Sequence, residues 1–236
     1  MSDFDRNVAA FPGAARTVAV DAGLRAHMIR VYNYMAGGVA LTGFVAYFTN
    51  LQFGQALYGS PLMYVLIFAP LALVFFLSWR IDSLAASTAR ALFFVYAALL
   101  GASLSIIFAV YTDASITKVF FISAAAFAGL SLWGYTTQRD LTGMGSFLMM
   151  GLIGIIIASL VNIFLKSSGL DWIISIIGVI VFAGLTAWDT QKIKEMYDVN
   201  DDGTVSGRKA VMGALSLYLD FINLFLMLLR LFGDRR

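Results

Sequence analysis

The stretch ALSLYLDFINLFLMLLR, from Ala214 to Arg230, places one aspartate in an otherwise apolar run. Between Lys209 and Arg230, Asp220 is the only charged residue. On a helix rising about 1.5 Å per residue, its carboxylate would lie about 15 Å from the cation at either end. That is the middle of a bilayer whose hydrocarbon core is about 30 Å thick. The stretch therefore predicts a transmembrane helix with a carboxylate at its centre.

The composition of the whole chain also indicates a membrane protein. Of 236 residues, 60% are hydrophobic and 13% are charged, whereas a soluble domain has about 25% charged residues. The net charge of +2 is too small to suggest binding to nucleic acid. The absence of cysteine excludes disulfides and thiolate metal sites, and the single histidine, His27, excludes a histidine-rich one. We expect no bound cofactor.

Seven apolar runs are long enough to cross a bilayer as helices. They are residues 31–51, 61–79, 91–112, 119–136, 144–165, 170–189 and 210–230. The short links between them leave no room for a second domain. We therefore predict an all-α integral membrane protein with one seven-helix domain, residues 25–233, between tails at 1–24 and 234–236. The first tail has no apolar signal segment, so we expect it to be cytosolic.

Basic residues are concentrated on one side of the predicted membrane, which indicates the cytoplasmic side. With the N-terminus inside, eleven of the 16 lie there: Arg6, Arg16, Arg25, Arg30, Arg80, Arg90, Arg139, Lys192, Lys194, Arg208 and Lys209. The other side holds Lys118, Lys166, Arg230, Arg235 and Arg236. The last three arginines fit this orientation less well. They leave open a six-span alternative, with one re-entrant run and a cytosolic C-terminus.

Small residues and one proline occur inside the predicted spans. Ala36-x-x-x-Ala40 and Ala125-x-x-x-Gly129 are spacings that allow helices to approach closely. Pro70 falls near the middle of the second span, where it removes a backbone hydrogen bond and favours a kink. We consider Pro70 a candidate hinge.

A second acidic residue, Asp189, ends the sixth apolar run. The following residues have no helix breaker, so we expect this helix to continue to about Met196. In an antiparallel hairpin with the last helix, Asp189 and Asp220 would then differ in depth by about 6 Å. Two carboxylates that meet away from water cannot both ionise cheaply, so such a pair shares a proton and titrates as a unit.

The pair therefore has two interpretations. Ionisable groups within a span are costly and usually functional, which favours a pH switch that could also hold calcium. The alternative is a structural, hydrogen-bonded aspartate that joins helices. A positive partner is expected, and Arg80 closes the second span on the same side. Arg80 could clamp the pair or could simply extend to the lipid headgroups.

The link DVNDDGTVSGRK, residues 198–209, follows the pattern of a calcium-binding EF-hand loop for half its length. Its last position, where that loop requires a bidentate glutamate, is Lys209. We interpret the segment as a polar connector, with weak calcium association as the alternative.

The stretches ALSLYLDFINLFLMLLRLFG and AWDTQKIK resemble the bacterial branch of the Bax inhibitor family, also called the transmembrane Bax-inhibitor-motif family. The resemblance covers nearly all of residues 25–233. It implies seven transmembrane helices, with the last one central and the other six around it, in a bacterial inner membrane. A second-helix glutamate found in some bacterial members has no counterpart here, because the position falls at about Ala69.

The resemblance further implies a calcium leak controlled by pH through an aspartate pair, which matches Asp189 and Asp220. It also implies an arginine latch, which matches Arg80. The alternative is a non-transporting regulator that binds membrane proteins such as a protease. We do not expect an enzyme: intramembrane aspartyl proteases require a Gly-x-Gly-Asp turn, and here Tyr218 and Leu219 precede the aspartate.

Overall fold

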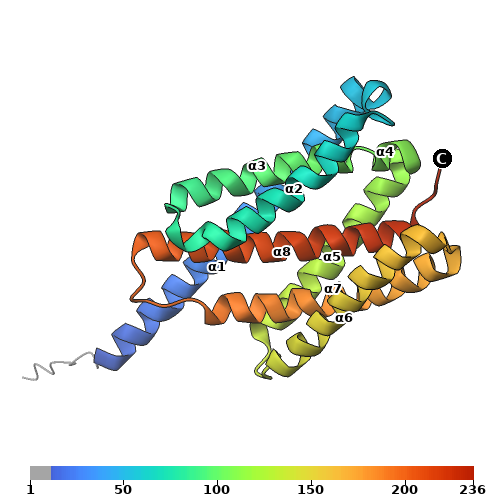
Figure 1. The fold of residues 1–236 in the computed structure, drawn as a ribbon. Helices are drawn as coiled ribbons and strands as arrows, with labels where there is room; N and C mark the ends of the chain where they lie inside the picture. The colour runs from blue at the N-terminus through green and yellow to red at the C-terminus, as the bar shows by residue number, and fades with distance from the viewer. Residues whose placement is uncertain (1–11) are drawn as a thin grey trace, which may run out of the picture.

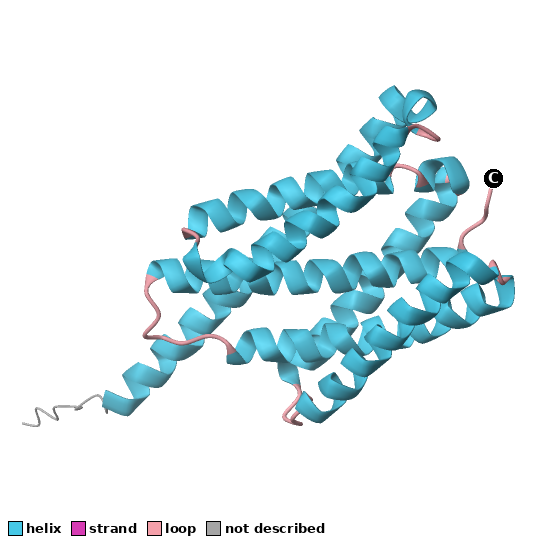
Figure 2. Ribbon diagram, in the orientation of Figure 1, coloured by secondary structure: helices cyan, strands magenta, loops and turns pink. Residues whose placement is uncertain are grey.

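The computed structural model describes residues 12–236, and their side chains from Ala22 onward. Long helices joined by short loops make up this part of the chain (Figure 2). In chain order they are α1 (Pro12–Leu57), α2 (Pro61–Arg80), the 3-10 turn η1 (Ile81–Ser83), α3 (Ala86–Leu104), α4 (Ile107–Val110), α5 (Asp113–Thr136), α6 (Thr142–Leu165), α7 (Ser168–Glu195) and α8 (Gly203–Phe232).

The all-helical membrane fold is confirmed, with differences at three predicted segments. Within residues 12–236, six segments are long and apolar enough to span a membrane: α2 with η1, α3 with α4, and α5 to α8. The predicted span at 31–51 lies inside α1, a 46-residue helix that is not among those six. The predicted tail at 1–24 lies partly outside the described residues, but α1 includes it from Pro12 onward. The predicted third span is divided at Ser105, between α3 and α4.

The last helix occupies the centre of the bundle, as predicted (Figure 1). Of the apolar stretch of α8, 72% is buried, against 44% for α7 and 11% for α6. Helices α1, α3, α5 and α7 pack directly against α8, while α2 packs mainly on α3, and α6 mainly on α7. The six surrounding helices therefore form two tiers, an inner one of four and an outer one of two.

A buried tyrosine explains how three of these helices are held together. Tyr218 of α8 is fully buried, and its ring packs edge-on against Phe93 and Tyr96 of α3. Its hydroxyl lies 2.6 Å from the Thr42 hydroxyl of α1. Thr42 in turn donates to the carbonyl oxygen of Ala97 at 2.9 Å. The polar end of a large core residue is thus satisfied inside the bundle, as burial requires.

The predicted small-residue contacts are wrong in position. The four residues of the two spacings are all exposed: Ala36, Ala40, Ala125 and Gly129. Close approach occurs instead at Gly134, where an added Cβ would collide with the backbone of Ala187 and so separate α5 from α7. A spacing motif does not reveal which face of a helix meets a neighbour.

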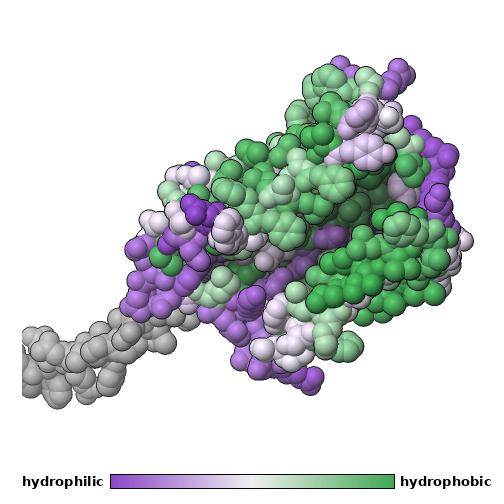
Figure 3. Space-filling view, viewed as in Figure 1, coloured by the Kyte–Doolittle hydropathy of each residue, from purple (hydrophilic) through white to green (hydrophobic). Residues whose placement is uncertain are grey.

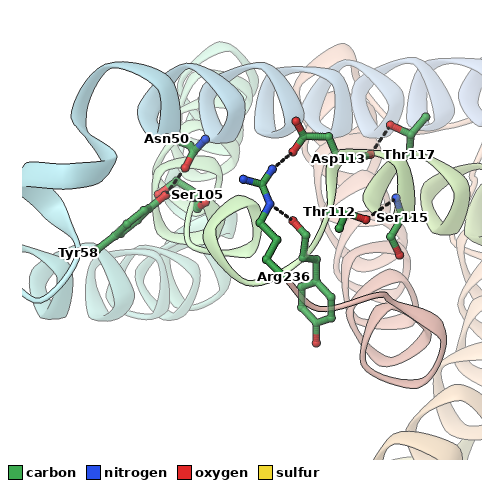
Figure 4. A network of polar contacts seen from close by, with 9 residues as sticks. Asn50, Tyr58, Ser105, Thr112, Asp113, Ser115, Thr117 and Arg236 are labelled. Atoms are coloured by element: carbon green, nitrogen blue, oxygen red, sulfur yellow. Dashed lines mark hydrogen bonds and ion pairs between the residues drawn. The ribbon is translucent and has the colours of Figure 1, made fainter.

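The C-terminal tail, residues 234–236, is fixed to the bundle. The backbone N–H of Thr112 donates to the carbonyl of Asp234 at 3.1 Å, and that of Arg236 donates to the carbonyl of Val110 at 2.9 Å. The Arg236 side chain adds an ion pair with Asp113 at 2.7 Å (Figure 4). These contacts anchor the tail to the junction between α4 and α5.

The contact between Gly134 and Ala187 gives a matched pair of substitutions on α5. Gly134→Ala should destabilise the protein by about 1–3 kcal/mol, because two backbones must separate. Gly129→Ala, where the added Cβ meets nothing within 4 Å, should be neutral or slightly stabilising, since alanine favours helix. Thermal unfolding in detergent measures both, and equal midpoints for the two variants would contradict the packing described.

Candidate functional site

The structure brings Asp189 and Asp220 together. They lie on the two arms of the α7–α8 hairpin, and their carboxyl groups are near enough for a side-chain hydrogen bond when one of them is protonated. Asp220 is only 5% exposed, and Asp189 is half-buried. Helix α7 continues to Glu195, as the sequence predicted, and this places Asp189 within the helix rather than at its end.

Both carboxyl groups line one cavity of about 530 Å³ between α6, α7 and α8. The α6 side contributes mostly apolar side chains, with Ser159 as its polar one. On α8, Ser216 and Asn223 line the cavity beside Asp220. Figure 3 shows a hollow across this face, floored by hydrophilic residues between two apolar surfaces.

Sequence reasoning missed the polar neighbours of the pair, although a signal for them exists. Ser216, Asp220 and Asn223 follow one another at four- and three-residue intervals, which places them on one face of α8. Ser159 carries no such signal, because only the packing of α6 over the hairpin brings it to the cavity.

Asp220 differs in its hydrogen bonding from the buried threonines of α7. The hydroxyls of Thr186 and Thr190 donate to carbonyls one turn earlier in α7, at 2.8 and 2.7 Å. By contrast, Oδ2 of Asp220 is buried without a hydrogen-bond partner among the described residues. An unsatisfied buried polar atom costs about 1–3 kcal/mol. A proton shared with Asp189 would satisfy this oxygen, because the two carboxyl groups are within reach of a side-chain hydrogen bond.

A calcium ion at the pair would receive few protein charges. Calcium takes six to eight oxygen ligands, and the described residues contain no group of three or more acidic or histidine side chains placed to hold a metal ion. The cavity offers two carboxylates, with Ser159, Ser216 and Asn223 as further oxygen donors. Any remaining ligands would be water.

The structure does not bring Arg80 to the pair. Arg80 ends α2 as an exposed side chain, does not line the cavity, and forms no ion pair with the side chains described from Ala22 onward. Arg208 of α8 instead donates to the carbonyl of Asp82 in η1. Pro70 is buried within α2, which is helical without a break from Pro61 to Arg80. The latch and the hinge remain predictions.

The connector between α7 and α8 uses its carboxylates locally. Asp202 accepts hydrogen bonds from the backbone N–H groups of Thr204 and Val205, at 2.8 and 2.7 Å, and so caps α8. Asp201 pairs with Lys209 at 2.6 Å. These contacts fit the interpretation as a polar connector, because capping and pairing satisfy the groups that a metal loop would leave free.

The connector also covers the only histidine. His27 of α1 is buried, 3% exposed, with its ring 5.8 Å from that of Tyr197, and neither ring nitrogen has a hydrogen-bond partner among the described residues. Burial lowers the pKa of His27, and the nearby Arg30 and Lys209 lower it further. The folded protein therefore holds this imidazole in its neutral form at neutral pH.

A pH dependence of stability follows from His27. Because its pKa is lower in the folded state, stability from this group is fully present above the unfolded value of about 6.5 and is lost as the pH falls from that value toward the lower folded pKa. The thermal midpoint of the wild type should fall more between about pH 7.5 and about pH 5.5 than that of His27→Phe. Parallel curves would show that His27 does not titrate on unfolding.

Known protein sequences match this chain along nearly its whole length. The family model described as "Inhibitor of apoptosis-promoting Bax1" matches residues 24–236. The chain is 49% identical over 231 residues to "Inner membrane protein YbhL" of Escherichia coli strain K12, covering 96% of this chain and 99% of that protein. It is also 49% identical over 223 residues to "Uncharacterized protein RP147" of Rickettsia prowazekii, covering 92% of each.

Proposed function

Because the chain belongs to the Bax inhibitor family, we propose that it is a passive, pH-gated calcium leak in which a proton shared by Asp189 and Asp220 is the switch. The observation that carries this proposal is the meeting of two carboxyl groups in one cavity of a membrane protein.

The physical basis of the switch is charge repulsion where water is scarce. With one shared proton, the pair carries a single negative charge and a hydrogen bond. Without it, two negative charges about 4 Å apart repel by about 4 kcal/mol at an effective dielectric constant of about 20. The pair must then separate or admit a cation, and either response changes the packing of α7 against α8.

The outer helices are the parts best able to respond. Only 17% of the apolar stretch of α2 and 11% of that of α6 are buried, so each moves at a small cost in packing. We place the Arg80 latch in a second conformation, reached when α2 bends at Pro70 and carries Arg80 toward the pair. Helix α6 covers the cavity directly and would open or close it.

We also propose a location and an orientation. The relative named an inner membrane protein in E. coli supports a bacterial inner membrane. The basic residues support a cytoplasmic N-terminus. If residues 31–51 of α1 cross the membrane as the sequence predicts, in addition to the six other spans, the α6–α7 hairpin lies outside the cytoplasm and the α7–α8 connector inside it.

The pair is tested by calcium flux into liposomes that contain the purified protein. In the wild type, the rate should differ between about pH 6 and about pH 8. In Asp220→Asn and Asp189→Asn that difference should disappear, because a single carboxyl has no proton to share. Asp82→Asn, an acidic residue outside the cavity, and His27→Phe should keep the wild-type dependence.

Two outcomes would contradict the proposal. One is unchanged pH-dependent flux in both cavity variants. The other is a correctly folded wild type with no flux at any pH that co-purifies with a membrane protease, which would support the non-transporting regulator instead.

The orientation is tested by thiol labelling, which the cysteine-free sequence makes simple. Val199→Cys, in the exposed connector, should react with a membrane-impermeant reagent only in inverted vesicles. Gly169→Cys, near the start of α7 where an added Cβ meets only the Ser167 hydroxyl oxygen at 3.9 Å, should react in intact spheroplasts. The reverse pattern would contradict this arrangement, because it is expected if the N-terminus is outside or if one of the first five runs does not cross, as in the six-span alternative. Labelling of both from one side would show that α7 does not cross the membrane.

A further inference from the structure

A second polar cavity, of about 340 Å³, lies at the end of the molecule that holds the α6–α7 hairpin and the C-terminus (Figure 1). Three cations line it, Lys166, Arg230 and Arg235. We call this cavity the basic pocket. Its other polar residues include Asp171, Asn162 and Ser168. It shares no lining residue with the aspartate cavity, although a smaller cavity of about 270 Å³ borders both.

The three cations come from separate segments, and the fold positions the backbone of each. Lys166 ends α6 in the left-handed conformation, φ 49°, a position that favours glycine. Arg230 lies in the last turn of α8. Arg235 belongs to the tail that hydrogen bonds anchor to the α4–α5 junction, and it lies over the Tyr111 ring at 6.0 Å. The fold, rather than sequence proximity, assembles the cluster.

More positive than negative side chains line the basic pocket. Asp171 approaches Arg230 at 3.7 Å, a loose ion pair between half-exposed side chains. Lys166 and Arg235 form no ion pair with the described side chains. The start of α7 adds backbone N–H groups and the positive end of a helix dipole beside them. The pocket therefore presents excess positive charge, which an anion would offset.

The surroundings indicate what kind of anion fits. Beside the pocket, large apolar side chains point outward: Phe164 is 86% exposed, Leu165 64% and Trp172 60%. In a membrane protein this surface faces acyl chains, and tryptophan favours the headgroup level. A ligand with a negative head and apolar tails meets both surfaces together.

We propose that the basic pocket binds the headgroup phosphate of an anionic phospholipid, held by Lys166, Arg230 and Arg235 with its acyl chains along Phe164 and Trp172. Three basic side chains converging on one cavity match the acceptor oxygens of a phosphate. This site would also explain why basic residues gather at the end of the molecule where positive-inside topology does not require them.

The experiment is a lipid titration of the purified protein in a non-ionic detergent, followed by native mass spectrometry. Phosphatidylglycerol should bind more tightly than zwitterionic phosphatidylcholine of the same chain length. Replacing both free cations, Lys166→Gln with Arg235→Gln, should weaken phosphatidylglycerol binding roughly 30-fold, at about 1 kcal/mol per cation. It should leave the binding of phosphatidylcholine unchanged.

Two further variants separate a ligand role from a structural one. Asp171→Asn should strengthen phosphatidylglycerol binding several-fold, because it frees Arg230 and removes the opposing charge; a merely structural role for the cluster predicts no gain. Lys118→Gln, an exposed lysine of α5 outside the pocket, is the matched control and should bind as the wild type does. Unchanged thermal midpoints would show that each variant is folded.

The same titration distinguishes a lipid from a soluble anion. Inorganic phosphate should compete only weakly, because it lacks acyl chains. Equal binding of both lipids, or full affinity in the double variant, would overturn the proposal. So would tight binding of inorganic phosphate that depends on the same cations in the absence of a lipid preference. These measurements do not involve calcium flux. A failure of the lipid-binding proposal would therefore not contradict the proposed calcium leak, and a failure of the leak would not contradict lipid binding.

Discussion

A carboxyl group in the middle of a membrane helix needs a polar neighbour, because hydrocarbon offers neither hydrogen bonds nor water. In this protein that requirement places α8 at the centre of the bundle and turns Asp220 toward Asp189 on the adjacent helix. The polar face formed with Ser216 and Asn223 then borders a cavity rather than lipid. The packing of α6, α7 and α8 thus keeps the Asp220 carboxyl group away from lipid.

The bundle combines a tight centre with a loose exterior. In the inner tier, Tyr218 joins α8 to α1 and α3, and Gly134 lets α5 approach α7 backbone to backbone. The outer helices α2 and α6 bury little of their apolar surface inside the protein. Lipid can replace most of their protein contacts at little cost, since it is equally apolar. A rearrangement that begins at the aspartate pair therefore moves the outer helices α2 and α6 more easily than the inner helices.

The two ends of the molecule carry different polar features. At one end, the α7–α8 connector is stabilised by capping and by a short ion pair, and it covers the neutral His27. At the other end, the anchored tail holds Arg235 beside Lys166 and Arg230. At the first end, capping and pairing satisfy Asp202 and Asp201 of the connector, whereas at the second Lys166 and Arg235 form no ion pair with the described side chains and lie next to an apolar surface. For this reason we interpret the connector as structural and propose the ligand site at the opposite end.

The sequence by itself determined the membrane class, the helical segments, the family resemblance and the two aspartates as candidates, because hydropathy, helix length and isolated charges are local properties. It also determined the extent of α7, which contains no helix breaker before Glu195. It could not choose the contacting face of each helix: the predicted contact at Gly129 is exposed, whereas the close approach of α5 to α7 occurs at Gly134. Only the tertiary structure placed Arg80 away from the pair, brought Ser159 to the cavity and gathered three distant cations into one pocket. Those facts depend on how helices pack, which is decided by contacts between residues far apart in the chain.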